Sequence, residues 1–86
     1  MRFRYSKHAQ QEMQRRGIPQ EVVDSVLSHP EQVVPEREGL NAYQSKVDFG
    51  GEELFLLRAI IKDDVEPAVV ITVYRTSKVD KYWRSS

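Results

Sequence analysis

The sequence contains no cysteine, so it can form neither a disulfide framework nor a thiolate metal site. Its two histidines, His8 and His29, stand far apart, whereas a zinc site usually needs three or four ligands at a recognisable spacing. A glycine-rich phosphate loop and a Gly-x-Ser-x-Gly nucleophile motif are also missing. We therefore expect no metal, no cofactor, and no nucleotide-dependent or acyl-transfer chemistry.

Long hydrophobic runs are missing as well. The longest near-apolar stretches, residues 54–57 and 68–73, are far too short to cross a bilayer. Residues 1–5 lack the apolar run of a secretion signal. The sequence thus predicts a cytoplasmic protein with no membrane segment.

Neither sign of charge is in excess, because 13 basic residues balance 13 acidic ones. The distribution is uneven: residues 1–30 carry five basic and three acidic groups (+2), residues 31–66 four and nine (−5), and residues 67–86 four and one (+3). A strongly basic chain would indicate binding to the phosphates of nucleic acid. Here only a local patch, formed if the two basic ends meet in the fold, could bind RNA.

What remains is the pattern of an ordinary globular domain. A length of 86 residues suits one hydrophobic core, and 40% hydrophobic with 30% charged residues is too apolar for disorder. There is no internal repeat and no linker. We predict a single domain over residues 1–86.

Two short helices are expected near the amino terminus. Ser6 is a suitable N-cap for a helix over residues 7–16, and Gly17 fits the left-handed position that ends it. Pro19 suits the first turn of a second helix, whose apolar stripe is formed by Val22, Val23, Val26 and Leu27, and Pro30 ends it.

From residue 31 the period changes to alternation, which predicts strands over residues 32–37, 42–49, 52–62 and 68–76. Gly50-Gly51 is a hairpin signal, and successive hairpins give an antiparallel meander. Val79, Tyr82 and Trp83 have helical spacing and predict a short C-terminal turn that docks on the body. The predicted fold class is α+β: a two-helix hairpin packed on a four-stranded antiparallel sheet.

The first candidate site lies on the open face of that sheet. In the third strand Leu57 and Ala59 would face the helices, so Arg58 faces away from them. Thr72 and Tyr74 would be its neighbours, and a cation beside a phenol can recognise phosphate. The alternative is that both side chains pack with their polar ends in water. Four apolar residues expected on this face would also form a patch for a partner: Leu54, Leu56, Ile60 and Val70.

The second candidate group lies on the first helix. His8 and Arg16 stand at the margin of the stripe that holds Ala9 and Met13, and Glu12 lies one turn after His8. Histidine suits acid–base work near neutral pH. The alternative is a structural histidine beside the core.

The carboxyl-terminal stretch from residue 74 to residue 84 interleaves aromatic and basic residues, among them Arg75 and Lys78. Such a mixture is compatible with single-stranded RNA, whose bases stack on rings while phosphates meet cations. The alternative is a docked tail in which Tyr82 and Trp83 cover the edge of the core.

The segment Tyr5-Ser6-Lys7-His8-Ala9, with Met13 and Arg16-Gly17-Ile18, resembles a bacterial domain-of-unknown-function family, number four-two-five-eight. Val33 and the strand Val70–Tyr74 are also similar to that family. Such domains resemble the barnase/EndoU/colicin/RelE group of small ribonuclease toxins in layout. The resemblance implies a toxin-like role beside a small antitoxin protein, with His8, Arg16, Thr72 and Tyr74 at the family's polar positions.

Three functional hypotheses follow. The first is metal-independent RNA cleavage, with His8 and Tyr74 transferring protons while Arg16 and Arg58 steady the phosphate; Thr72, Arg75 and Lys78 would bind the substrate. The second is a non-catalytic protein-interaction module, working with a partner or as a homodimer. The third is a module that binds RNA without cutting it.

Overall fold

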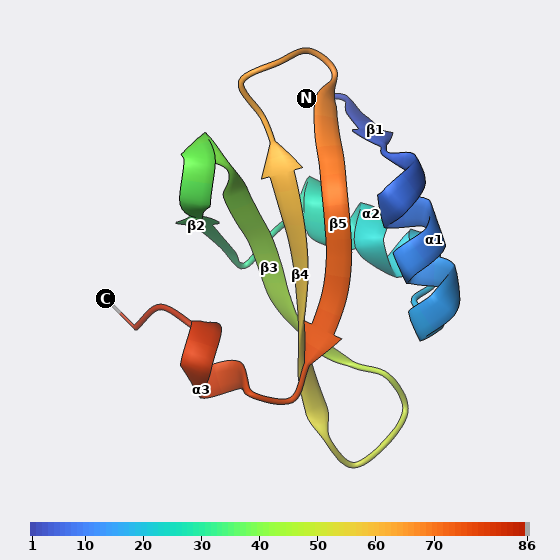
Figure 1. Cartoon of the computed structure of the whole chain (residues 1–86). Coiled ribbons are helices and arrows are strands. Elements are labelled where there is room, and N and C mark those ends of the chain that lie inside the picture. The colour runs from blue at the N-terminus through green and yellow to red at the C-terminus, as the bar shows by residue number, and fades with distance from the viewer. Residues whose placement is uncertain (86) are drawn as a thin grey trace.

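Two helices cover one face of a twisted sheet in the computed structural model, which describes residues 1–85 (Figure 1). The elements are, in chain order, β1 (Phe3–Tyr5), α1 (Lys7–Arg16), α2 (Gln20–Ser28), β2 (Gln32–Pro35), the 3₁₀ turn η1 (Arg37–Gly39), β3 (Asn41–Asp48), β4 (Leu54–Lys62), β5 (Ala68–Thr76) and α3 (Val79–Tyr82). The α+β class is therefore confirmed.

Helix α1 begins and ends at the predicted residues because its caps are built as expected. The Ser6 hydroxyl accepts the Ala9 amide at 3.0 Å, and Gly17 takes the left-handed conformation at φ 65°. The same hydroxyl donates to the Ile71 carbonyl at 2.9 Å. This hydrogen bond thus also links the start of α1 to β5.

In the described part of the chain the sheet has five strands, in the order β1-β5-β4-β3-β2. The prediction of four strands, all antiparallel, is wrong in both respects. Phe3, Arg4 and Tyr5 pair in parallel with Ala68, Val69 and Val70. Alternation of Phe3 and Tyr5 with arginines is the strand signal in the sequence, but three residues are too few for that pattern to stand out.

A bulge in β5 changes which of its residues face the helices. Ile60 pairs with Thr72 but Ile61 pairs with Val70, so Ile71 is an extra residue. Val70 therefore turns to the helix side, where it is fully buried. Its predicted position on the open face is wrong, because the alternation assumed an unbroken strand.

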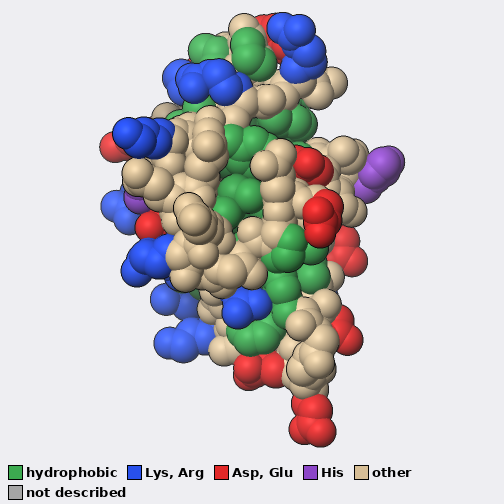
Figure 2. Space-filling view, turned by 90° about the vertical axis from the view of Figure 1, so that its right-hand side faces the viewer, with side chains coloured by type: hydrophobic (Ala, Val, Ile, Leu, Met, Phe, Trp, Pro, Cys, Tyr) green, Lys and Arg blue, Asp and Glu red, His purple; other side chains and the backbone are tan. Residues whose placement is uncertain are grey.

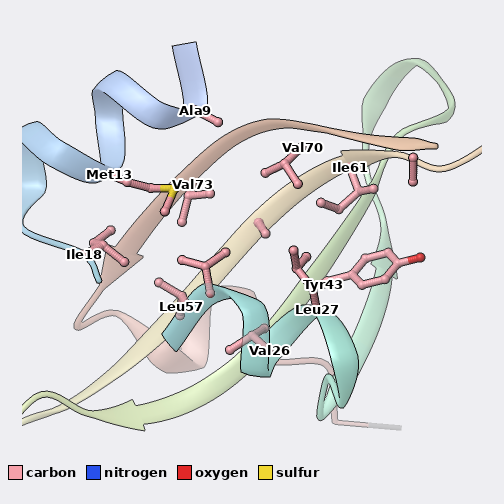
Figure 3. Packing of buried hydrophobic residues seen from close by; sticks show 13 residues of the cluster. Ala9, Met13, Ile18, Val26, Leu27, Tyr43, Leu57, Ile61, Val70 and Val73 are labelled. Atoms are coloured by element: carbon pink, nitrogen blue, oxygen red, sulfur yellow. The ribbon is translucent and has the colours of Figure 1, made fainter. Parts of the chain in front are cut away.

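The core lies between the helices and the sheet (Figure 3). Ala9 and Met13 from α1, with Val23, Val26 and Leu27 from α2, meet side chains from the central strands. The central strands contribute Tyr43, Leu57, Ala59, Ile61, Val70 and Val73. Since Leu57 and Ala59 face the helices, the side chain between them is held on the opposite face.

The predicted exposed apolar patch on that opposite face is not present. Leu56 is fully buried, Val70 faces the helices, and of the four residues only Leu54 is strongly exposed, at 47%. The C-terminal turn α3, which the sequence predicted, lies in front of the sheet in Figure 1, on the side away from α1 and α2.

Candidate functional site

The most unusual residue of the fold is a buried arginine on the central strand. Arg58 is 2% exposed, and each nitrogen of its guanidinium donates one hydrogen bond. The Nε group donates to Gln44 Oε1 at 2.8 Å, Nη1 to the Tyr74 hydroxyl at 2.6 Å, and Nη2 to Glu36 Oε2 at 3.0 Å. We call Arg58, Glu36, Gln44 and Tyr74 the Arg58 cluster.

The fold brings these four groups together from separate strands and a loop. Gln44, Arg58 and Tyr74 are directly opposite one another on β3, β4 and β5, so the strand register alone makes them neighbours. Glu36 follows β2, and its side chain is one-third exposed. The cluster is therefore a row of polar groups across the sheet, with the carboxylate at its more accessible end.

Burial and hydrogen bonding act against each other on the protons of the cluster. Burial lowers the pKa of Arg58, but its bonds to Glu36 and Tyr74 outweigh burial, so the net direction is upward. Burial raises the pKa of Tyr74, which the Arg58 cation only partly offsets. At neutral pH the cluster therefore holds a guanidinium cation and a protonated phenol.

The C-terminal segment, residues 77–85, lies over this cluster. The Tyr82 ring centroid is 4.4 Å from the Arg58 guanidinium carbon, and Gln44 Nε2 donates to the Tyr82 carbonyl at 3.2 Å. The Gln32 side chain makes two hydrogen bonds to the backbone of Arg84. Its Nε2 donates to the Arg84 carbonyl at 2.6 Å, and its Oε1 accepts from the Arg84 amide at 3.1 Å. The Lys46 ammonium nitrogen lies 4.0 Å from the centroid of the Trp83 ring. The docked tail, one of the two alternatives for this segment, is thus what the structure contains.

Of the residues singled out from the sequence, Arg58, Thr72 and Tyr74 share the open face as predicted, with Thr72 two positions before Tyr74. Arg75 does not lie there: its guanidinium carbon lies 4.6 Å from the Phe49 ring and 5.0 Å from the Phe55 ring, and alternation turns it to the helix side. Lys78 is exposed in the turn before α3.

His8 and Arg16 are not brought to the Arg58 cluster. Both lie on α1, which packs on the opposite face of the sheet through Ala9 and Met13. Arg16 Nε pairs with Glu12 Oε1 at 3.1 Å, and His8 is exposed. The catalytic and binding roles assigned from the sequence stay predictions, but their expected convergence at one place is not found.

Sequence reasoning missed Glu36 and Gln44 as parts of the Arg58 cluster and Tyr82 as the residue whose ring lies over it. Gln44 carried a usable signal, because a glutamine amid the alternating residues of an internal strand needs polar partners when it is buried. The alternation predicts Glu36 within a strand over residues 32–37, whereas β2 stops at Pro35 and the Glu36 side chain then reaches Arg58. The position of Tyr82 depends on how the tail docks.

Cavities adjoin both sides of the fold. One of about 250 Å³ lies beside the cluster and is lined by Glu36, Arg37, Glu38, Leu40 and Ile60. Another of about 390 Å³ lies between α2 and β3, with Val22, Val26 and Val47 among its lining residues. Within residues 1–85, no group of three or more His, Asp or Glu side chains is arranged to hold a metal ion.

Charges are segregated even though they balance. On the face that Figure 2 shows, most Lys and Arg side chains lie along the left flank and the top, and most Asp and Glu side chains lie along the right flank and the lower end, with hydrophobic atoms between them. A neutral protein of this kind still presents a local basic surface to an anionic ligand. None of the helices in the described part of the chain has the length and apolar character needed to span a membrane.

Comparison with known proteins gives one match. Curated proteins and solved structures contain no significant match to this chain. A family model described as a domain of unknown function, DUF4258, matches residues 5–75, which include α1, α2, the central strands and every residue of the Arg58 cluster. By its sequence and over most of its length, the chain is a member of the DUF4258 family.

Proposed function

We propose that this chain acts on RNA without a metal ion, as a small toxin-like ribonuclease module whose reactive groups are those of the Arg58 cluster. One observation carries the proposal: a carboxylate and a phenol both contact the same buried guanidinium, at 3.0 Å and 2.6 Å. Metal-free cleavage of RNA needs a proton acceptor, a cation for the phosphate and a proton donor. Glu36, Arg58 and Tyr74 supply these three.

The proposed reaction is an internal transesterification. Glu36 takes the proton of the ribose 2′-hydroxyl, whose oxygen attacks the adjacent phosphorus while the bond to the 5′-oxygen breaks. Arg58 stabilises the charge on the non-bridging oxygens, and Tyr74 donates its proton to the leaving 5′-oxygen. The products are a 2′,3′-cyclic phosphate and a 5′-hydroxyl. Glu36 thus takes the role that the sequence assigned to His8.

The two ends of the Arg58 cluster differ in how a substrate could reach them. Glu36 borders the cavity of about 250 Å³, while Arg58 lies under the Tyr82 ring. An RNA base can stack on the guanidinium in place of that ring, since every base offers a flat π-face. Thr72, beside Tyr74, remains a candidate for substrate contact, and Lys78, Lys81 and Arg84 of the displaced segment would follow the phosphates.

The test is cleavage of end-labelled single-stranded RNA by purified protein in the presence of EDTA, with the new ends identified as cyclic phosphate and 5′-hydroxyl. We expect Glu36→Gln and Tyr74→Phe to lose about 100-fold or more in rate, as removal of a general acid or base does. His8→Ala and Glu38→Gln are the matched controls and should keep the parental rate. Loss in His8→Ala with full activity in Glu36→Gln would overturn the assignment.

The second candidate function is a non-catalytic module that binds a small antitoxin-like protein or RNA. The hydrogen bonds within the Arg58 cluster favour it. Arg58 is already bonded at all three nitrogens within the chain, which suits a structural part. In this case the EDTA assay shows no cleavage by any variant. Titration with single-stranded RNA at two salt concentrations then distinguishes an RNA-binding module from a protein-binding one, because phosphate-driven RNA binding weakens as salt rises.

A further inference from the structure

The outer edge of β3 is only half covered. Strand β2 pairs with β3 from Asn41 to Gln44 and no further, whereas β3 continues beside β4 to Asp48 (Figure 1). Within residues 1–85, no strand pairs with this side of residues 45–48, which therefore form an open strand edge. Such edges pair readily with another strand unless they are protected.

The direction of the backbone groups on this edge can be read from one contact. The Lys46 amide donates to Glu31 Oε1 at 2.6 Å, so the Lys46 amide points outward, away from β4. Because backbone groups alternate along a strand, the amide and carbonyl of Asp48 point outward as well. The Glu31 carboxylate thus sits where the carbonyl of a neighbouring strand would sit, and it covers only the Lys46 amide.

From these observations we propose that the chain forms a homodimer in which the 46–48 edges of two copies pair antiparallel, with Lys46 opposite Asp48 of the second copy and Val47 opposite Val47. This register makes the outward-pointing residues Lys46 and Asp48 the hydrogen-bonded pairs, four bonds in all by symmetry. Each lysine also faces an aspartate of the other copy, and such cross-strand opposite charges stabilise a sheet. No other register centred on this edge pairs the backbone groups and the charges together.

The helix side of the same edge has room for the second copy. The cavity of about 390 Å³ between α2 and β3 is lined in part by Val22, Val26 and Val47. Val47 lies on this side of the sheet and is half-buried against the core. In the paired edges the two Val47 side chains meet beside these cavities, where each covers apolar surface that a single copy leaves open.

In the single chain, the Glu31 carboxylate protects the edge by accepting the hydrogen bond of the Lys46 amide. The carbonyl of Asp48 from the second copy replaces its carboxylate on the Lys46 amide, and Glu31, which is exposed, turns to water. The pairing spans three residues, so the interface is small and the dissociation constant should lie in the micromolar range. The dimer does not depend on the proposed RNA chemistry, because the edge contains no residue of the Arg58 cluster.

The test is sedimentation equilibrium of the full chain from about 1 to 500 µM, with far-UV circular dichroism to show that each variant is folded. Lys46→Asp and Asp48→Lys each place like charges opposite one another at two places, and each should weaken association about 10- to 30-fold. The double variant Lys46→Asp/Asp48→Lys restores the opposite charges and should restore dimerisation. Lys81→Asp, an equal change of charge in α3, is the control.

Two further variants sharpen the test. Glu31→Ala removes the carboxylate that competes for the Lys46 amide and should strengthen association. Val47→Lys places two cations beside each other on the symmetry axis and should abolish dimerisation. A parent that stays monomeric at 500 µM would overturn the proposal and leave the edge to a strand from a different protein. Dimerisation that the single charge changes do not weaken, or that the double change does not restore, would also overturn it.

Discussion

The Tyr74 hydroxyl oxygen lies 2.6 Å from Nη1 of Arg58, and the two residues are direct partners in the pairing of β4 with β5. Arg58 is the donor of this bond, so the phenol keeps its own proton for a further acceptor. The contact joins the two longest strands on the face away from α1 and α2. Its two members should nevertheless differ widely in their importance for stability.

Arg58→Met should lower the free energy of unfolding by about 2–4 kcal/mol, because it leaves Gln44, Tyr74 and Glu36 without their shared donor. Tyr74→Phe should lower it by about 1 kcal/mol, since it removes one acceptor and leaves the guanidinium its other two bonds. Urea unfolding followed by circular dichroism gives both values. Equal losses in the two variants would contradict the central position of Arg58.

Ser6→Ala should cost about 1–2 kcal/mol of stability. The hydroxyl both caps α1 at the Ala9 amide and donates to the Ile71 carbonyl, so two partly buried backbone groups lose their partner. Thermal unfolding measures the loss. Ser77→Ala, at an exposed position after β5, serves as the control and should leave the midpoint unchanged.

The protein should lose stability at alkaline pH, in part through Tyr43. Burial, helped by the hydrogen bond to Asp63, raises the pKa of Tyr43 to about 12 from its ordinary value of 10.0. Above pH of about 10 the unfolded chain releases this proton while the folded chain retains it. The contribution of Tyr43 is therefore complete below pH 10 and is lost as the pH rises toward 12, by up to about 1.4 kcal/mol per pH unit.

Unfolding in urea at several pH values between about 9 and 12 measures this slope. Tyr43→Phe should make the fall of stability shallower, and Asp63→Asn should do so in part, since it removes the bonded carboxylate. The slope will not vanish, because burial also raises the pKa of Tyr5. Parallel curves for parent and Tyr43→Phe would contradict the prediction.

The C-terminal segment should undock before the domain unfolds. No residue of α3 is buried, and the segment depends on a few polar and ring contacts, including the two bonds between Gln32 and Arg84. Trp83 is the single tryptophan of the chain, so its fluorescence reports on this segment. We expect its transition at lower urea than that of far-UV circular dichroism, and lower still in Gln32→Ala.

Gln11→Ala, on the exposed side of α1, is the matched control and should move neither transition. If fluorescence and circular dichroism change together in every variant, the segment is an integral part of the domain. Proposals that require it to leave the Arg58 cluster would then need another route for the ligand.

Local signals in the sequence were sufficient for the helices and for most strands. The caps Ser6 and Gly17 define α1, and the Val- and Ile-rich run defines β5 from Ala68 to Thr76. Alternation also placed Arg58, Thr72 and Tyr74 on one face. These features depend on neighbours in the chain or on the period of a strand, which one sequence displays directly.

The features that could not be predicted depend on distant contacts. The bulge that turns Val70 inward becomes visible only when β4 and β5 are paired, and the parallel position of β1 depends on pairing with residues 65 positions later in the chain. The expected meeting of His8 with Arg58 failed because a helix margin and an open strand face belong to opposite sides of the sheet. Glu36 reaches Arg58 only because β2 ends at Pro35.

The parallel pair of β1 with β5 has a consequence for how the chain is made. Residues 3–5 leave the ribosome before their partners, residues 68–70, which stand 65 positions later in the chain. Until then α1 has no strand to cover, and the Ser6 hydroxyl has no Ile71 carbonyl to bind. Contacts of such long sequence separation form late in folding. A nascent chain halted before residue 68 should therefore keep residues 1–16 accessible to proteases and chaperones, and these residues should become protected in one step once β5 has emerged.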